Sequence, residues 1–161
     1  GLVRYWDKAG TKDGGAFTVG VLMGRDLKDA YWILHVKRGQ WGPGERENII
    51  HQTAKADGLH VIVGIEQEPG SGGKESAQNT VQRLAGHRVR CDLPSGDKIA
   101  RAEPFASQVY WDMVHMVEAR WNNDYLDELQ YFPDSKYKDQ VDASSGAFNM
   151  LAKPKVKVGA F

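Results

Sequence analysis

Residues 60–66 read H-V-I-V-G-I-E, an apolar, β-branched run that ends on Glu66. A run without polar alternation is typical of a strand buried on both faces, as in a parallel sheet covered by helices. Before it, residues 45–57 have the apolar spacing of a helix that stops at Gly58. After it, a Gly-rich loop leads to a second predicted helix at residues 74–85. This stretch therefore predicts βα units with parallel strands.

Three more strands are expected before this unit, because short β-prone runs follow one another with brief polar connections. They cover residues 2–6, 16–23 and 31–36, and their spacing predicts an antiparallel meander. A fifth strand is expected at residues 88–92. The predicted fold is an α/β domain with a mixed five-stranded sheet, three antiparallel strands plus parallel βα units, and helices on both faces. The rest of the chain has helical patterns at residues 97–109, 122–132 and 139–151, and a strand or hairpin arm at 113–117.

The length of 161 residues fits one domain, which we expect at residues 1–152, followed by a basic tail at residues 153–161. A bare Gly1 before a strand indicates a domain cut from a longer chain. Lys and Arg number 21, as do Asp and Glu, so the formal net charge is zero. This excludes a histone-like binder but allows a nuclease whose acidic centre offsets a basic rim. A single cysteine excludes internal disulfides and cysteine-based zinc sites, and no apolar stretch approaches the ~18 residues of a membrane span.

Acidic residues stand at the strand ends and at the start of the last helix. Asp7 closes the first strand and Glu66 the fourth, while Asp139 and Asp142 share one face of the last helix. If the first and fourth strands are parallel neighbours, Asp7 and Glu66 lie about 5–8 Å apart. Crowded carboxylates repel unless a cation neutralises them, and hard oxygen ligands select Mg²⁺ or Mn²⁺, two of which can clamp a phosphodiester. The alternative for each acid taken alone is an ordinary strand-end or helix-cap role.

Three basic residues are candidates for DNA contact. Lys98 and Arg101 share a helix face, and Lys74 follows the Gly-rich loop. Phosphate contact is the functional interpretation, and a solvated surface is the alternative. The loop is not a Walker A motif, because Glu68 and Glu75 stand where that motif needs Gly and Ser or Thr. Less certain helpers in the tail are Lys153, Lys155 and Lys157.

Several short motifs occur together in an order that resembles a known family. They are R-Y-W-D-K-A-G at residues 4–10, I-E-Q-E-P-G-S-G-G-K at 65–74, G-D-K-I-A-R-A-E-P-F-A at 96–106, W-N at 121–122, F-P at 132–133 and K-D-Q-V-D-A at 138–143. The sequence is similar, over nearly its whole length, to the C-terminal nuclease domain of the large terminase of tailed bacteriophages. This resemblance implies an RNase H-like fold of the resolvase type and a metal-dependent endonuclease that cuts concatemeric viral DNA.

The resemblance also implies roles for single residues. The family's first acidic ligand falls on Asp7, its second on Glu66 and its third on Asp139, so these three are expected to be catalytic. Asp142 is a further ligand candidate, because Lys138 stands where many members carry an acid. Two Mg²⁺ or Mn²⁺ ions are the implied cofactors, with Asp7 bridging both. The implied partners are double-stranded viral DNA, an N-terminal ATPase domain of the same chain, the small terminase subunit and the portal, in the host cytoplasm at the procapsid.

Three alternatives stay open. Another RNase H-like nuclease, such as a junction resolvase, would need a dimer and selectivity for four-way junctions. A DNA-docking module without catalysis is disfavoured because all the candidate acids are present. One half of a sugar-kinase-like ATPase would need a second lobe, for which 161 residues leave no room.

Overall fold

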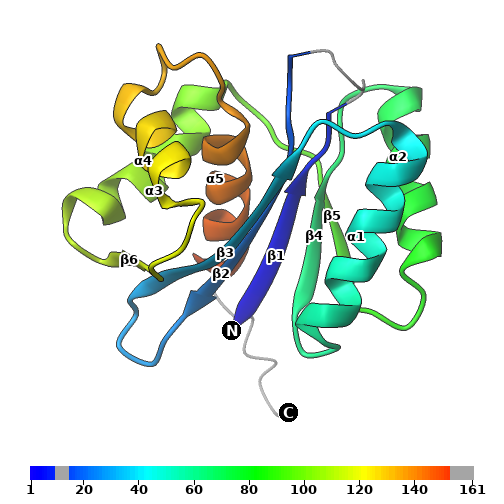
Figure 1. Ribbon diagram of the computed structural model, residues 1–161, viewed down its shortest axis with the longest axis horizontal. Coiled ribbons are helices and arrows are strands. Elements are labelled where there is room, and N and C mark those ends of the chain that lie inside the picture. Colours follow the sequence, from blue (N-terminus) through cyan, green and yellow to red (C-terminus); the bar gives the residue numbers. More distant parts are fainter. Residues whose placement is uncertain (10–14, 153–161) are drawn as a thin grey trace, which may run out of the picture.

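The computed structural model describes residues 1–9 and 15–152. They form a mixed sheet with helices on both faces, in the strand order β5-β4-β1-β2-β3-β6 (Figure 1). The strands are β1 (Leu2–Asp7), β2 (Thr18–Arg25), β3 (Tyr31–Gly39), β4 (Ile62–Glu66), β5 (Val89–Asp92) and β6 (Val114–Met116). The helices are α1 (Pro43–Asp57), α2 (Ser71–Arg83), α3 (Lys98–Tyr110), α4 (Asn122–Tyr131) and α5 (Asp139–Ala152).

Strand pairing confirms the predicted mixed sheet. β2 runs antiparallel to both β1 and β3, whereas the β1–β4, β4–β5 and β3–β6 pairs are parallel. β2 is therefore the single reversed strand of this sheet, and the carboxyl ends of β1, β4 and β5 meet at one edge (Figure 1). The sheet has six strands rather than the five predicted, because residues 114–116 pair with β3. A three-residue strand is too short for its periodicity to separate it from a hairpin arm.

The start of α2 differs from the predicted start of the second helix. The helix begins at Ser71, inside the segment whose glycines predict a loop. A Cβ atom added at Gly73 would lie 2.0 Å from the carbonyl oxygen of Glu68. Glycine therefore lets the first helical turn pack directly against the preceding loop, a reason that composition alone does not reveal.

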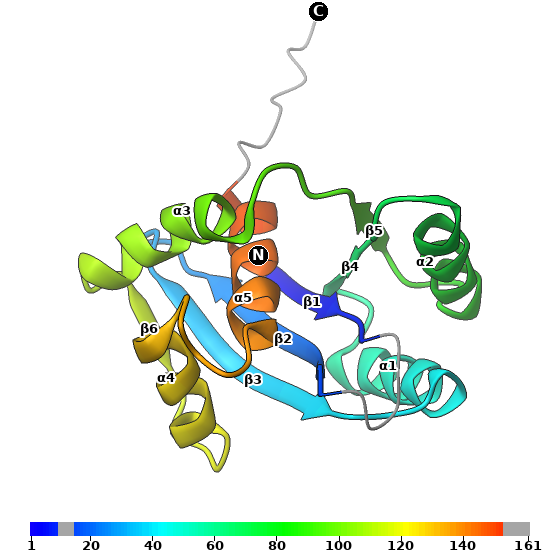
Figure 2. The ribbon, with the colours of Figure 1, turned by 90° about the horizontal axis from the view of Figure 1, so that it is seen from above.

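The helices form two layers around the sheet. α1 and α2 cover one face, and α5 covers the other, with α3 and α4 packed alongside it (Figure 2). Alternate residues of β1 enter the two cores: Tyr5 packs in the cluster that includes Phe148 of α5, and Trp6 packs with Ile50 of α1. A Cβ atom at Gly146 would come 2.2 Å from the Tyr5 ring, so α5 lies close against β1. By the same alternation, Asp7 is directed to the α5 side.

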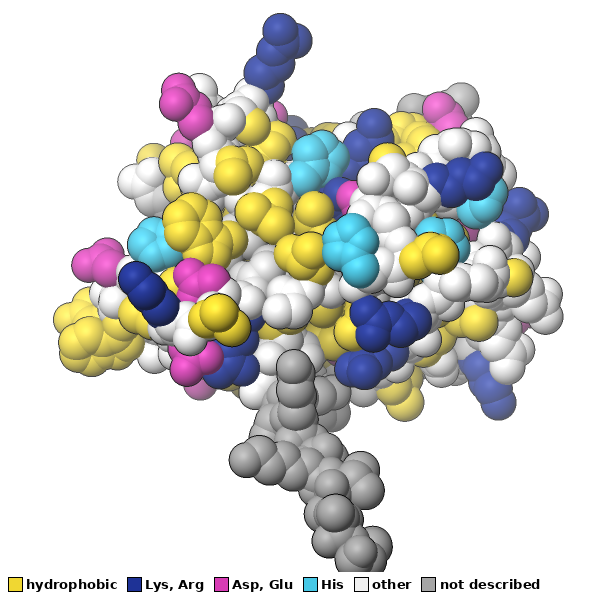
Figure 3. All heavy atoms as spheres, turned by 90° about the horizontal axis from the view of Figure 1, so that it is seen from below, with side chains coloured by type: hydrophobic (Ala, Val, Ile, Leu, Met, Phe, Trp, Pro, Cys, Tyr) yellow, Lys and Arg dark blue, Asp and Glu magenta, His cyan; other side chains and the backbone are white. Residues whose placement is uncertain are grey.

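The opposite end of the molecule, where β1 begins, carries a separate hollow. It has a volume of about 420 Å³ and is lined by Gly1, Leu2, Trp32, Leu34 and His60 among others. Figure 3 views this end and shows hydrophobic and histidine side chains gathered on it. Among the described helices, none combines the length and the apolar character needed to cross a bilayer.

Candidate metal centre

Three carboxylates gather where β1 ends and α5 begins. Asp7 is the last residue of β1, and Asp139 and Asp142 lie in the first turn of α5. One carboxylate oxygen from each lies within 4.8 Å of those of the other two. The partial positive charge at the amino end of α5 favours acids at this position. The end of β1 and the first turn of α5 therefore meet in the fold.

Glu66 flanks these three acids. It ends β4, whose parallel register with β1 pairs Trp6 with Ile65, so Glu66 follows beside Asp7 at the same edge. It does not belong to the set of oxygens within 4.8 Å of one another. Its Oε1 atom lies 3.6 Å from Nη1 of Arg101. Sequence reasoning thus identified four acids that the fold collects at one edge, three of them with carboxylate oxygens within 4.8 Å of one another.

Burial and neighbouring charges raise the pKa values of Asp7, Glu66 and Asp139. Burial raises the pKa of Asp7 well above its ordinary value, and the charges of Glu66, Asp142 and Asp139 raise it further. Burial is also the main cause of the raised pKa of Glu66 and of Asp139. Each ionised carboxylate disfavours the ionisation of the others. An all-oxygen donor set under such repulsion fits a hard divalent cation such as Mg²⁺ or Mn²⁺.

Two basic side chains of α3 reach into the acidic cluster. Lys98 Nζ donates to Asp142 Oδ2, and Arg101 Nη2 lies 3.8 Å from Asp142 Oδ1. Asp97 caps the start of α3, because its Oδ1 accepts from the Ala100 amide at 2.8 Å. The predicted DNA contacts Lys98 and Arg101 therefore lie against the acids themselves.

The other basic candidates lie elsewhere. Lys74 is exposed on α2. Lys153, Lys155 and Lys157 lie outside the described residues. The structure therefore leaves DNA contact by all of these side chains a prediction.

A neighbouring aromatic cluster orients Asp139, and sequence reasoning did not identify it. The backbone amide of Phe17 donates to Asp139 Oδ2 at 3.0 Å. The Arg38 guanidinium lies 3.8 Å from the centre of the Phe17 ring, and the Tyr137 ring meets Phe17 edge-on at 4.8 Å. No local sequence signal connects these residues, because they come from the loop before β2, from β3 and from the loop before α5.

Two further acids support the centre from adjacent elements. Asp92 ends β5 beside Glu66 and accepts a hydrogen bond from the Tyr5 hydroxyl at 3.0 Å. Glu128 of α4, which is buried, accepts from the Val141 amide at 2.7 Å and so caps α5. Asp92 could have been identified from the sequence, because it is an acid at the end of a strand like Asp7 and Glu66.

Comparison with known proteins places this geometry in a family. A family model described as a terminase RNaseH-like domain matches residues 4–151. Comparison with curated proteins gives no match. The nuclease of the large terminase from the thermophilic phage G20c, solved with bound zinc, is similar at a TM-score of 0.68, with 15% identity over 92% of this chain and 80% of that chain. The same nuclease with bound magnesium gives 0.67, with 14% identity over the same shares of the two chains.

A resolvase shares the fold as well. The fowlpox virus Holliday junction resolvase matches at a TM-score of 0.58, with 10% identity over 93% of this chain and 96% of that chain. Identities this low show the fold alone, and they agree with the predicted RNase H-like architecture. The family match, which spans nearly the whole sequence, goes further: the chain is a member of the terminase RNaseH-like nuclease domain family.

Proposed function

We propose that this domain is a metal-dependent endonuclease that cuts concatemeric double-stranded viral DNA for packaging. The supporting observation is the cluster of Asp7, Asp139 and Asp142, with oxygens within 4.8 Å of one another, in a terminase RNaseH-like domain. The related G20c nuclease has been solved with zinc and with magnesium. An acidic cluster of this kind has the ligand chemistry for phosphodiester hydrolysis by two metal ions.

Four acids would hold the ions. Asp7, Asp139 and Asp142 would hold one divalent cation, and Glu66, beside Asp7, would help to hold a second, which makes Asp7 the shared ligand. When bound, Mg²⁺ or Mn²⁺ lowers the pKa of the attacking water and stabilises the charge of the leaving oxygen. The amide of Phe17 donates to one oxygen of Asp139 and so helps to orient this carboxylate.

The basic residues of α3 have two tasks in this proposal. In the absence of metal, Lys98 and Arg101 neutralise Asp142 and Glu66. Once cations occupy the cluster, these side chains are available to bind phosphate oxygens of the DNA strand. Lys74, exposed on α2, would contact a phosphate farther along. Because the net charge of the chain is zero, attraction for DNA depends on such local positive charge.

Membership of this family also supports a proposal about the wider setting. We propose that residues 1–152 act as the nuclease domain of a longer chain with an ATPase domain. The small terminase subunit and the portal would be its other partners, at the procapsid in the host cytoplasm.

Plasmid cleavage tests this function. Supercoiled plasmid should become nicked and linear with Mg²⁺ or Mn²⁺, and should stay intact with excess EDTA. Asp7→Asn should abolish cleavage, whereas Asp127→Asn, an exposed acid on α4, should not. Cleavage in EDTA, or full activity of Asp7→Asn, would contradict the proposal. A four-way junction serves as the comparison substrate, and a strong preference for it would favour a resolvase.

A further inference from the structure

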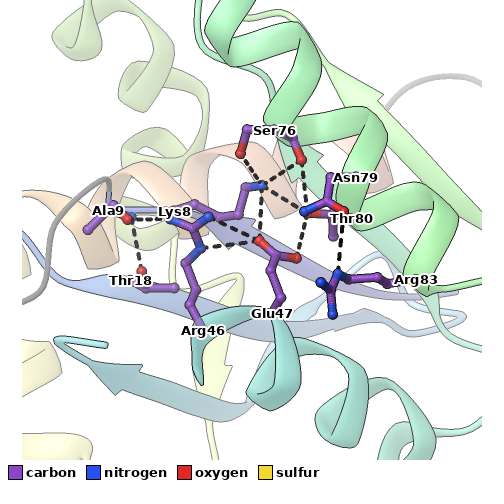
Figure 4. Close-up of polar contacts among 9 residues, drawn as sticks. All are labelled: Lys8, Ala9, Thr18, Arg46, Glu47, Ser76, Asn79, Thr80 and Arg83. Atoms are coloured by element: carbon purple, nitrogen blue, oxygen red, sulfur yellow. Dashed lines mark hydrogen bonds and ion pairs between the residues drawn. The ribbon is translucent and has the colours of Figure 1, made fainter. Parts of the chain in front are cut away.

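A buried polar cluster lies behind Asp7, on the face of the sheet covered by α1 and α2. We call it the Lys8 cluster, and Figure 4 shows its side chains converging from the end of β1, from α1 and from α2. None of the acids of the metal centre belongs to it. Its members are Lys8, Arg46, Glu47, Ser76 and Thr80.

Lys8 is fully engaged in this cluster. Its Nζ atom donates to Ser76 Oγ at 2.8 Å, to Thr80 Oγ1 at 2.9 Å and to the Ser76 carbonyl at 3.2 Å. Glu47 Oε1 lies 3.5 Å away, and the two side chains are only 7% and 4% exposed. The three protons of the ammonium group are thus matched by three acceptors, so Lys8 has no donor left for a ligand.

Glu47 joins the parts of the cluster. Its Oε2 accepts from Thr80 Oγ1 at 2.7 Å, and its Oε1 accepts from Arg46 at 3.1 and 3.2 Å. Arg46 in turn donates to the carbonyl oxygen of Ala9 at 2.7 Å. The amide of Ala9 donates to Thr18 Oγ1 at 2.9 Å. Side chains from α1, α2 and β2 therefore hold residues 8 and 9 in place.

These contacts begin where the strand pairing of β1 ends. Asp7 forms the last antiparallel pair of β1, with Val19, and the parallel ladder to β4 ends one residue earlier, at Trp6. Beyond Asp7, the backbone therefore lacks the strand pairing that fixes residues 2–7. The position of the Asp7 carboxylate then depends on how the next two residues are held, because a strand end without support frays.

We propose that Lys8 is a positioning residue for Asp7: through the Lys8 cluster it fixes the end of β1, so that Asp7 meets Asp139 and Asp142 in the geometry that a divalent cation needs. This inference rests on the proposed function. Residues that support a ligand from outside typically change metal affinity or activity by roughly 10- to 100-fold when removed. Loss of one partner of a buried ion pair leaves the other charge uncompensated, so loss of Lys8 should lower stability as well as metal affinity.

A second buried ion pair provides a matched comparison. Arg4, which lies within β1, binds Asp57 of α1 through two hydrogen bonds of 2.7 Å, and the side chains are 2% and 10% exposed. Like Lys8, it pairs with an acid of α1 on the face of the sheet that α1 and α2 cover. It lies three residues before Asp7, within the paired part of β1. Loss of Arg4 should therefore lower stability without changing the metal centre.

The experiment compares Mn²⁺ affinity in Lys8→Met and Arg4→Met, by calorimetric titration of the domain well below the melting temperature of each variant. We expect the Kd for Mn²⁺ to rise roughly 10-fold or more in Lys8→Met and to stay within about twofold of wild type in Arg4→Met. Cleavage should be impaired more in Lys8→Met than in Arg4→Met. In Lys8→Met, the loss of cleavage rate should be smaller at saturating Mn²⁺ than at limiting Mn²⁺. Both variants replace a buried, positively charged side chain by a shorter, neutral methionine, so the two proteins lose the same charge.

Each result of this experiment either supports or contradicts the positional role of Lys8. An unchanged Kd in Lys8→Met, or an equal rise in both variants, would overturn the positional role and leave the nuclease proposal standing. If Lys8→Met does not fold, Thr80→Val decides, since it is nearly isosteric and removes the hydroxyl that joins Lys8 to Glu47. It should raise the Kd at least threefold if the proposal is right. Absence of Mn²⁺ binding by the wild-type domain would overturn the proposed function and this inference together.

Discussion

Arg101 of α3 faces Glu66 at the end of β4, with 3.6 Å between guanidinium nitrogen and carboxylate oxygen. The Arg101 guanidinium also lies 3.8 Å from Asp142. Lys98, one helical turn before Arg101, binds Asp142 as well. The centre therefore combines four acids with two tethered cations. DNA binding and metal binding should be coupled, because a metal ion and a basic side chain compete for the same carboxylates.

The first prediction concerns the salt dependence of DNA binding. DNA binding is measured with Ca²⁺ in place of a metal that supports cleavage. The slope of log K against log salt should be flatter by about two in the Lys98→Ala/Arg101→Ala variant than in wild type, because each phosphate contact contributes roughly 0.9 to that slope. All sequences should be weakened alike, because phosphate contacts carry no sequence information. Lys28→Ala, an exposed lysine between β2 and β3, is the control. An unchanged slope in the double variant would show that these residues do not contact phosphates.

The second prediction concerns Asp7 and stability without metal. A carboxyl group whose pKa is raised by folding stabilises the fold at low pH, and this contribution is lost as pH rises through the raised pKa. Asn cannot ionise, so Asp7→Asn should melt at the same or a higher temperature than wild type at pH 7 in EDTA. Glu66→Gln and Asp139→Asn should behave alike, since their pKa values are also raised. Adding Mn²⁺ should reverse the order, because wild type gains more binding energy. A clearly lower melting temperature of Asp7→Asn in EDTA would contradict this account.

The third prediction concerns pH and His35. Its Nδ1 atom lies 3.0 Å from Arg4 Nη1, so the ring accepts this hydrogen bond in its neutral form. Burial lowers the pKa of His35 below 6.5, and the charge of Arg4 lowers it further. As pH falls below about 6.5, the unfolded chain takes up this proton first, so the free energy of unfolding decreases until the folded-state pKa is passed.

His35→Asn keeps an acceptor for Arg4 but does not titrate. Urea unfolding of both proteins between about pH 5 and pH 7.5 measures the effect. As the pH is lowered, the wild-type protein should lose more unfolding free energy than His35→Asn. A difference that is constant across this range would refute the role of His35.

The fourth prediction concerns the cap of α5. Glu128, 5% exposed, accepts from the Val141 amide and from the Gln140 side chain. Glu128→Ala leaves a buried donor unpaired, which should destabilise the domain by about 1–3 kcal/mol in urea unfolding. Glu118→Ala, an exposed glutamate after β6, should change stability by less than about 0.5 kcal/mol. Equal stability of the two variants would mean that other groups cap α5.

Local patterns of the sequence determined most of the framework. The apolar run at 60–66 identified β4 as a buried strand, and the position of Asp7 and Glu66 at strand ends followed from the same patterns. These inferences succeed because periodicity and composition reflect the face that each residue presents, which is a property of a short segment. Short segments were less decisive for the same reason. Residues 113–117 were expected to be either a strand or a hairpin arm, and residues 114–116 form β6, whereas the start of α2 is composed of residues typical of a loop.

Only the tertiary structure decided how the identified side chains lie relative to one another. Glu66 flanks the close set of acids, Lys98 and Arg101 lie against those acids, and Lys8 is engaged on the other face of the sheet. The physical reason is that these distances depend on how α1, α2, α3 and α5 pack across the sheet. That packing is set by contacts such as Gly146 against Tyr5, between residues far apart in the sequence. The sequence alone therefore determined which acidic and basic groups are available, and the packing of helices on the sheet decided which of those groups meet.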